Sequence, residues 1–219
     1  MRKSKNAIRN LTEAAKITKN IFTAVRPEIK PGASEREIAR KIENLIMKRG
    51  LRRSFTTIVA SGPNAAKPHA KLTDRKIKKN DLVVVDFGAI YKGQRGDMTR
   101  TVIIGKMEKR MRELYNAVAT AHKMAIKKIR PGIKISDFVQ SINRYMRKKG
   151  FEKHIRHTLG HGIGTRIHEG PKLSEKNNRI LKEGMVVTIE PGLYVDGKGG
   201  VRIEDAVCIT KNGARVLAT

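Results

Sequence analysis

Apolar and polar residues follow two different periodicities along this chain, and the two patterns succeed each other in a repeated order. Four segments carry apolar residues at the three- and four-residue spacing of amphipathic helices: residues 10–25, 31–50, 108–129 and 131–150. Four shorter apolar runs follow the helical pairs and predict strands: residues 82–89, 99–104, 185–191 and 201–210. Glycine-containing connections separate the members of each strand pair, so each pair is expected to form a hairpin.

Two of the helical segments are alike in sequence. Residues 31–50 read PGASEREIARKIENLIMKRG, and residues 131–150 read PGIKISDFVQSINRYMRKKG. Both open with Pro-Gly, both close with basic residues and glycine, and their apolar positions superpose. A capping-box pattern, Ser34 with Glu37, opens the first of these helices. Gly50 stands where a left-handed helix end is expected.

The repeated order predicts the fold class. Two helices followed by a hairpin, occurring twice, are typical of an α+β domain with a pseudo-two-fold repeat around an antiparallel sheet. We expect a single catalytic domain over residues 1–219, with halves of about 1–105 and 106–219. A length of 219 residues suits one such domain with a substantial core.

Five side chains of the kinds that bind metals lie in distinctive phrases. They are Asp86 in VVVDFGA, Asp97 in GDMTRT, His161 in GHGIG, Glu190 in TIEPGLY and Glu204 in VRIED. Several of these acids are flanked by Val and Ile, and isolated buried acids are rare. Four buried carboxylates brought together would repel one another and take up protons. Two divalent cations would remove that conflict, and such a pair activates water and polarises a carbonyl. The sequence therefore predicts a two-metal hydrolase.

Composition limits the other classes of protein. No apolar run approaches 18 residues, and the basic start MRKSKNAIRN is not followed by an apolar segment, so neither a membrane span nor a secretory signal is expected. The single cysteine, Cys208, lies in the apolar run AVCIT and is interpreted as a buried small hydrophobe. A cytoplasmic enzyme is the default expectation.

The charge is unusual for an enzyme. Lys and Arg total 48 against 20 acidic residues, which gives a net charge of +28. Such a field attracts polyanions, so nonspecific association with nucleic acid or the ribosome stays open beside a merely solubilising surface. Aromatic residues are 4% and Trp is absent, which leaves few side chains for stacking bases. A homodimer is also left open.

The motifs resemble those of the pita-bread metallopeptidases, which include the Xaa-Pro peptidases prolidase and aminopeptidase P, the methionine aminopeptidases and creatinase. The resemblance spans almost the whole chain and rests on VVVDFGAIYKGQRGDMTRT, HTLGHGIGTRIHEGP, VVTIEPGLYV and GVRIEDAVCIT. Asp97 follows Asp86 by eleven positions, as in that family. All five ligand positions carry the residue that the resemblance implies.

The resemblance implies a role for each ligand. Asp97 and Glu204 would bridge two metals, Asp86 would complete one site, and His161 and Glu190 would complete the other. A hydroxide between the metals would attack the scissile carbonyl, with Glu190 as the proton shuttle. The oxygen-rich ligand set fits Mn, Co or Fe, and also Zn with less ideal geometry.

Three further histidines gain roles from the same resemblance. His69 resembles a histidine near the substrate, and His168 one that binds the scissile amide or stabilises the oxyanion. His157 resembles a residue near the proline-binding region. His122 and His154 lie in no motif and are expected to be ordinary. Two arginines, Arg100 in DMTRT and Arg202 in VRIED, are candidates to pair with ligand carboxylates, and a structural or solvated role fits each equally well.

The segment PNAAKPHAKLTDRKIKKNDLVVVDFGA favours the Xaa-Pro peptidases over the methionine aminopeptidases within this family. Two departures from the Xaa-Pro pattern stand out. The chain begins almost at the catalytic unit, so no N-terminal creatinase-type domain is expected, and the pair Thr165 and Arg166 replaces an apolar–acidic pair. Methionine aminopeptidase activity is the alternative reaction. A non-catalytic cationic module that binds RNA, ribosome or protein is the alternative of another class.

Overall fold

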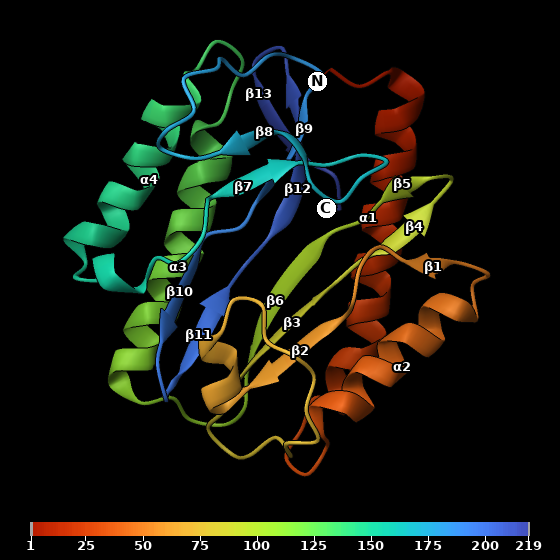
Figure 1. The fold of residues 1–219 in the computed structure, drawn as a ribbon, viewed down its shortest axis with the longest axis vertical. Helices are drawn as coiled ribbons and strands as arrows, with labels where there is room; N and C mark the ends of the chain where they lie inside the picture. Colours follow the sequence, from red (N-terminus) through yellow and green to blue (C-terminus); the bar gives the residue numbers. More distant parts are fainter. Residues whose placement is uncertain (1, 219) are drawn as a thin grey trace.

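A computed structural model describes residues 2–218 of the chain. Four helices lie on the two outer sides of the molecule, with the strands between them (Figure 1). They are α1 (Lys5–Val25), α2 (Glu35–Met47), α3 (Lys109–Lys128) and α4 (Ile135–Lys148). The strands of the first half are β1 (Arg52–Arg53), β2 (Ile58–Ser61), β3 (Leu82–Phe87), β4 (Ala89–Tyr91), β5 (Gln94–Arg95) and β6 (Met98–Ile103). The strands of the second half are β7 (Gly160–Gly162), β8 (Glu169–Leu173), β9 (Val186–Ile189), β10 (Gly192–Val195), β11 (Gly199–Arg202), β12 (Asp205–Thr210) and β13 (Gly213–Val216).

All four predicted helices are present, and their ends follow local capping. Helix α1 begins at Lys5 rather than at residue 10, because the Ser4 side chain accepts a hydrogen bond from Ala7 N and caps the helix earlier. The predicted capping box of α2 is formed: Glu37 N donates to Ser34 Oγ at 3.1 Å, and Ser34 N donates to Glu37 Oε2 at 2.6 Å. Gly50 has φ +68°, as expected of a left-handed helix end.

The two halves repeat one strand plan, as the sequence predicts. In the first half β3 pairs with β2 and β6, and in the second β9 pairs with β7 and β12. A small antiparallel hairpin extends each main pair, β4 with β5 and β10 with β11. This arrangement confirms the α+β fold with a pseudo-two-fold repeat and an antiparallel sheet in each half.

One predicted strand is broken, and the break matters for function. Residues 201–210 form two strands, β11 and β12, separated at residues 203 and 204. The cause is a change of partner, because Glu204 N donates to Thr99 O in the other half at 3.1 Å rather than continuing its own ladder. The interruption places the Glu204 side chain at the junction of the halves.

Each half buries its own apolar core between helices and strands. Helices α1 and α2 cover the first half and contribute Ile21, Ile38 and Ile42, while α3 and α4 cover the second with Leu114 and Phe138. Because the helices occupy the outer side of each half, the inner sides of the strands are left to face one another. Cys208 is buried in a smaller apolar cluster, as expected. Within residues 2–218 we find no helix with both the length and the apolar character needed to cross a membrane.

Candidate metal centre

The fold brings all eight predicted site residues to one cavity of about 1340 Å³. The lining includes the five predicted ligands and the three histidines given a role: Asp86, Asp97, His161, Glu190, Glu204, His69, His157 and His168. The acids come from equivalent places in the two halves. Asp97 lies one residue before β6 and Glu204 one residue before β12. The pseudo-two-fold repeat thus turns two distant hairpins into one cluster of carboxylates.

Three of these side chains approach one another as ligands of a single ion would. One oxygen of Asp97, one oxygen of Glu204 and one ring nitrogen of His161 all lie within 4.8 Å of one another. Glu190 adjoins them, since its Oε1 is 3.4 Å from His161 Nε2. Asp86 shares the cavity, and its Oδ2 accepts from Arg202 Nη2 at 2.5 Å. The Asp86 Oδ1 atom is buried and has no hydrogen-bond partner within residues 2–218.

The ring of His161 is oriented by its own backbone. His161 Nδ1 lies 3.0 Å from Gly162 O, which can only accept, so Nδ1 carries the proton and Nε2 presents a lone pair to the carboxylates. Burial lowers the pKa of His161 to about 4, so the ring is neutral near pH 7. Thr188 Oγ1 accepts from His161 N at 3.1 Å and lies 3.4 Å from Glu190 Oε1, which links these two residues.

Burial and mutual repulsion disfavour the charged forms of the clustered carboxylates. Burial, with the charge of Glu204 next in importance, raises the pKa of Asp97 well above its ordinary value. Burial and the charges of Glu190 and Asp86 do the same for the pKa of Glu204. Burial raises the pKa of Glu190 to about 7. Buried acids crowded in this way, a lone imidazole nitrogen and an orphan Asp86 oxygen together form a donor set suited to divalent cations.

Two of the three additional histidines, His157 and His168, have different surroundings. His157 is fully engaged: Nδ1 donates to Thr158 O at 2.8 Å, and Nε2 accepts from the Tyr194 hydroxyl at 2.8 Å. Burial lowers the pKa of His157 to about 4. His168 is exposed and lies edge-on to His161, with ring centroids 4.4 Å apart. Its imidazole is thus beside the candidate metal ligands and open to a bound molecule.

Arg202 forms hydrogen bonds to several parts of the site. Its bond to Asp86 agrees with the expectation that it pairs with a ligand carboxylate. Besides Asp86, it donates from Nη1 to the Tyr194 hydroxyl at 2.7 Å and to Pro68 O at 3.1 Å, next to His69. A chain of hydrogen bonds therefore runs from Arg202 through Tyr194 to His157. Tyr194 was not predicted, although its place in the PGLYV phrase was a signal for it.

Arg100 behaves differently. Its Nη1 donates to the backbone oxygen of Glu204 at 2.5 Å, and its Nη2 to Asp205 Oδ1 at 2.7 Å, so it reaches no ligand carboxylate. The buried His122 has its Nε2 3.2 Å from Asp205 Oδ2, an ion-pair contact without hydrogen-bond geometry. It therefore contacts the residue that follows the candidate ligand Glu204, which its sequence context gave no means to foresee. His154, as expected, lies outside the cavity lining, with Nδ1 3.0 Å from Tyr194 O.

The loop that carries His168 is held by hydrogen bonds and an ion pair from residues of the first half, Lys3 and Arg95. Lys3 Nζ donates to Glu169 Oε2 at 2.5 Å, and Glu169 Oε1 accepts from Arg166 N at 3.1 Å. Arg95 Nε donates to Thr165 O at 3.0 Å. Gly164 permits this approach, because a Cβ there would collide with the Lys3 ammonium and the Glu169 carboxylate. None of these contacts could be read from motif spacing.

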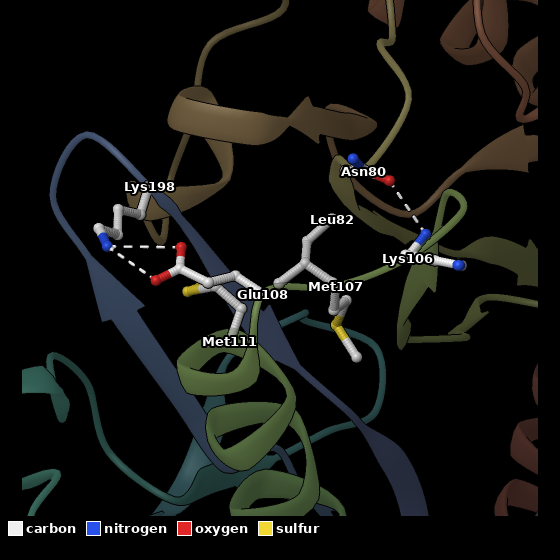
Figure 2. A pocket seen from close by; sticks show the side chains of 7 residues that line it. All are labelled: Asn80, Leu82, Lys106, Met107, Glu108, Met111 and Lys198. Atoms are coloured by element: carbon white, nitrogen blue, oxygen red, sulfur yellow. Dashed lines mark hydrogen bonds and ion pairs between the residues drawn. The ribbon is translucent and has the colours of Figure 1, made fainter.

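A second, smaller hollow of about 480 Å³ lies at the start of α3 and the turn between β10 and β11 (Figure 2). Lys198 pairs with Glu108 at one side of it, with Nζ 3.3 Å from Oε1, and the apolar side chains of Leu82, Met107 and Met111 also line it. It shares no lining residue with the cavity of the carboxylates. We therefore place the functional site in the larger cavity.

Comparison with known proteins agrees with this geometry. The sequence profile of metallopeptidase family M24 matches residues 9–211. The chain is 41% identical over 216 residues to the Xaa-Pro dipeptidase of Pyrococcus furiosus, which covers 98% of this chain and 62% of that protein. The solved prolidase from Pyrococcus furiosus superposes with a TM-score of 0.97 at 40% identity, covering 100% of this chain and 65% of the other. The X-Pro aminopeptidase from Thermotoga maritima gives 0.96 at 36% identity, covering 100% of this chain and 62% of that one. The chain thus spans less than two thirds of the length of the relatives it matches.

Proposed function

Because this chain belongs to metallopeptidase family M24, we propose that it is a dimetal-dependent exopeptidase that hydrolyses the peptide bond before proline. The observation that carries the proposal is the convergence of the eight predicted site residues on one cavity. The names of the relatives, Xaa-Pro dipeptidase and X-Pro aminopeptidase, support the choice of the X-Pro bond. An X-Pro bond is a tertiary amide with its own geometry, so its hydrolysis calls for a dedicated site.

Asp86, Asp97, His161, Glu190 and Glu204 would hold the two metal ions, and Asp97, His161 and Glu204 already bring one ligand atom each within 4.8 Å of one another. When bound, two divalent cations lower the pKa of water and polarise a carbonyl oxygen. Ligation by four carboxylates and one imidazole favours Mn, Co or Fe, with Zn also compatible. Hydrogen bonds from Thr99 to Glu204 and from Arg202 to Asp86 hold two of these ligands in place.

The protein's own groups supply the proton transfers and the alignment of the substrate. We assign the proton transfer to the leaving amine to Glu190, whose Oε1 lies 3.4 Å from His161 Nε2 at the ligand cluster. We assign to His168, which is exposed beside His161, the donation of a hydrogen bond to the oxygen of the scissile carbonyl. We assign His69 and His157 to the binding of the substrate around proline. His157 can act there without ionising, because its pKa of about 4 keeps it neutral.

Hydrolysis of three peptides tests the proposal. The metal-free protein, with and without added Mn²⁺ or Co²⁺, is given an Xaa-Pro dipeptide, an Xaa-Pro tripeptide and Met-Ala-Ser. We expect metal-dependent release before proline that is lost in His161→Ala and Glu190→Gln, and the ratio of dipeptide to tripeptide turnover separates dipeptidase from aminopeptidase. Preferential cleavage of Met-Ala-Ser would replace the proposal with methionine aminopeptidase activity. Metal binding without turnover would favour a cationic binding module.

The remaining proposals concern the domain organisation, location and partners of the protein. We propose that residues 1–219 act as one catalytic unit, since the proposed ligands come from both halves of the repeat. A cytoplasmic location, a homodimer and association with nucleic acid or the ribosome stay predictions from composition.

A further inference from the structure

Three cations line the mouth of the candidate site without an ion-pair partner. Arg166, Lys172 and Lys176 are exposed and belong to the lining of the large cavity. None of them makes an ion pair with a side chain of residues 2–218. A fourth cation of the lining, Arg156, differs from them because both of its terminal nitrogens bond to Asp196, at 2.8 and 2.5 Å.

The three positions are tied to the reacting groups by the backbone. Lys172 is the direct partner of His161 in the antiparallel pairing of β7 and β8. Directly opposed residues send their side chains to the same face of a sheet, so Lys172 lies on the face of the candidate ligand. Arg166 precedes the exposed His168 by two residues, and Lys176 follows β8 in the chain.

Nearby acids do not neutralise these cations. Glu169 is held by Lys3 at 2.5 Å, and Glu175, the neighbour of Lys176, accepts from Arg147 at 2.8 Å and from Asn143 at 2.6 Å. Deeper in the cavity, the four carboxylates would be balanced by the two divalent cations of the proposed function, on which this step rests. The charge that a substrate meets at the mouth is therefore positive.

We propose that this site prefers acidic peptides, with an Asp or Glu side chain in the residue before the scissile bond or in the residue after proline. A cavity lined by charge of one sign concentrates ligands of the opposite sign, and low-dielectric walls strengthen the effect. The preference is expected in kcat/KM, because the cations act on the approach and binding of the substrate rather than on the reacting atoms. It should weaken as salt shortens the range of the field.

Isosteric peptide pairs with a blocked C-terminus isolate the side-chain charge. We would compare Glu-Pro-NH2 with Gln-Pro-NH2, and Ala-Pro-Glu-NH2 with Ala-Pro-Gln-NH2, using the Mn²⁺-loaded protein. The expected result is a kcat/KM about 5- to 10-fold higher for the Glu member of at least one pair at low salt, falling towards equality in about 0.5 M NaCl. Equilibrium binding of the same pairs by calorimetry provides a readout that does not depend on turnover.

Variants locate the effect. Arg166→Gln, Lys172→Gln and Lys176→Gln combined should bring the Glu/Gln ratio close to one. The control is Lys198→Gln at the separate hollow of Figure 2, which removes a cation from the protein but not from this cavity, and should leave the ratio unchanged. An equal loss in the control would assign the preference to net charge and overturn the proposal.

The remaining outcomes separate this inference from the proposed function. Turnover of the neutral peptides with no Glu preference in rate or binding overturns the inference and leaves the Xaa-Pro activity standing. A preference only for free Ala-Pro over Ala-Pro-NH2 assigns the cations to the terminal carboxylate and also overturns it. The protein could also bind the Glu peptides more tightly but cleave none of them. That result would support the acidic preference and contradict the proposed function.

Discussion

Thr99 and Glu204 meet across the junction of the two halves, 105 residues apart in the sequence, with Thr99 Oγ1 2.7 Å from Glu204 Oε2. The same two residues are joined by their backbones, since Glu204 N donates to Thr99 O at 3.1 Å. Strand β6 of one half thus sets both the position and the orientation of a candidate ligand that belongs to the other.

Replacing Thr99 by Val should weaken metal binding without changing any ligand. The change removes the hydrogen bond to Glu204 and the acceptor for Arg202 Nε, which lies 3.1 Å from Thr99 Oγ1. Loss of a partner that orients a ligand typically costs 10- to 100-fold in metal affinity, and we expect about 10-fold for Mn²⁺ by calorimetry. The matched control is Thr101→Val, which removes two hydrogen bonds with the backbone of Arg202 and none with a ligand. Equal losses in both variants would contradict the prediction.

In the metal-free protein, the stability that the buried carboxylates contribute should be lost as the pH rises from about 4 to 7. His157 and His161, whose pKa values burial lowers to about 4, contribute in the opposite direction, so the carboxylate effect is read from the difference between metal-free and metal-loaded protein. Burial raises the pKa of Glu190 to about 7 and raises those of Asp97 and Glu204, so the folded state binds protons that the unfolded state has released. Stability from such groups is present below the unfolded pKa of about 4 and is lost as the pH rises through the folded pKa.

Melting curves from pH 4 to 8, with EDTA and with excess Mn²⁺, test this dependence. We expect the gap between the metal-loaded and metal-free melting temperatures to widen as the pH rises, because metal binding displaces those protons. A gap that is constant or narrows with rising pH would show that the carboxylates are not protonated in the metal-free fold.

Tyr194→Phe should destabilise the protein by about 1–3 kcal/mol, the cost of leaving buried polar groups without partners. The hydroxyl accepts from Arg202 Nη1 and donates to His157 Nε2 in a fully buried position. Urea unfolding compared with Tyr115→Phe, a half-buried tyrosine on α3, provides the control. Similar losses of stability in the two variants would contradict the prediction that the Tyr194 hydroxyl stabilises the fold through Arg202 and His157.

Lys3→Met should lower kcat on an Xaa-Pro dipeptide severalfold and leave Mn²⁺ affinity unchanged. The ammonium of Lys3 holds Glu169, the residue after His168, whereas none of the proposed ligands touches Lys3. Lys3→Arg should restore most of the activity, because a guanidinium can still pair with the carboxylate. Lys5→Met, at an exposed position on α1, is the control. Loss of metal affinity in Lys3→Met would indicate a general disturbance of the fold.

The helices, the strand pairs and the identity of the candidate ligands could all be predicted from the amino-acid sequence alone. Helix spacing, the Ser34–Glu37 capping box and the left-handed Gly50 depend on residues within a few positions of one another, so local pattern was sufficient for them. The ligand phrases are also local, since each combines an acid or a histidine with an apolar or glycine-rich flank.

The side chains that support those ligands come from distant parts of the chain, and the sequence could not identify them before the packing of the fold was known. Thr99 with Glu204, Lys3 with Glu169 and Arg202 with Asp86 are separated by 105, 166 and 116 residues. The break between β11 and β12 likewise follows from how one half packs on the other, because Glu204 N donates to Thr99 O of the first half. Periodicity reports which face of an element is buried but not which partner covers it, because that choice depends on the packing of both halves together.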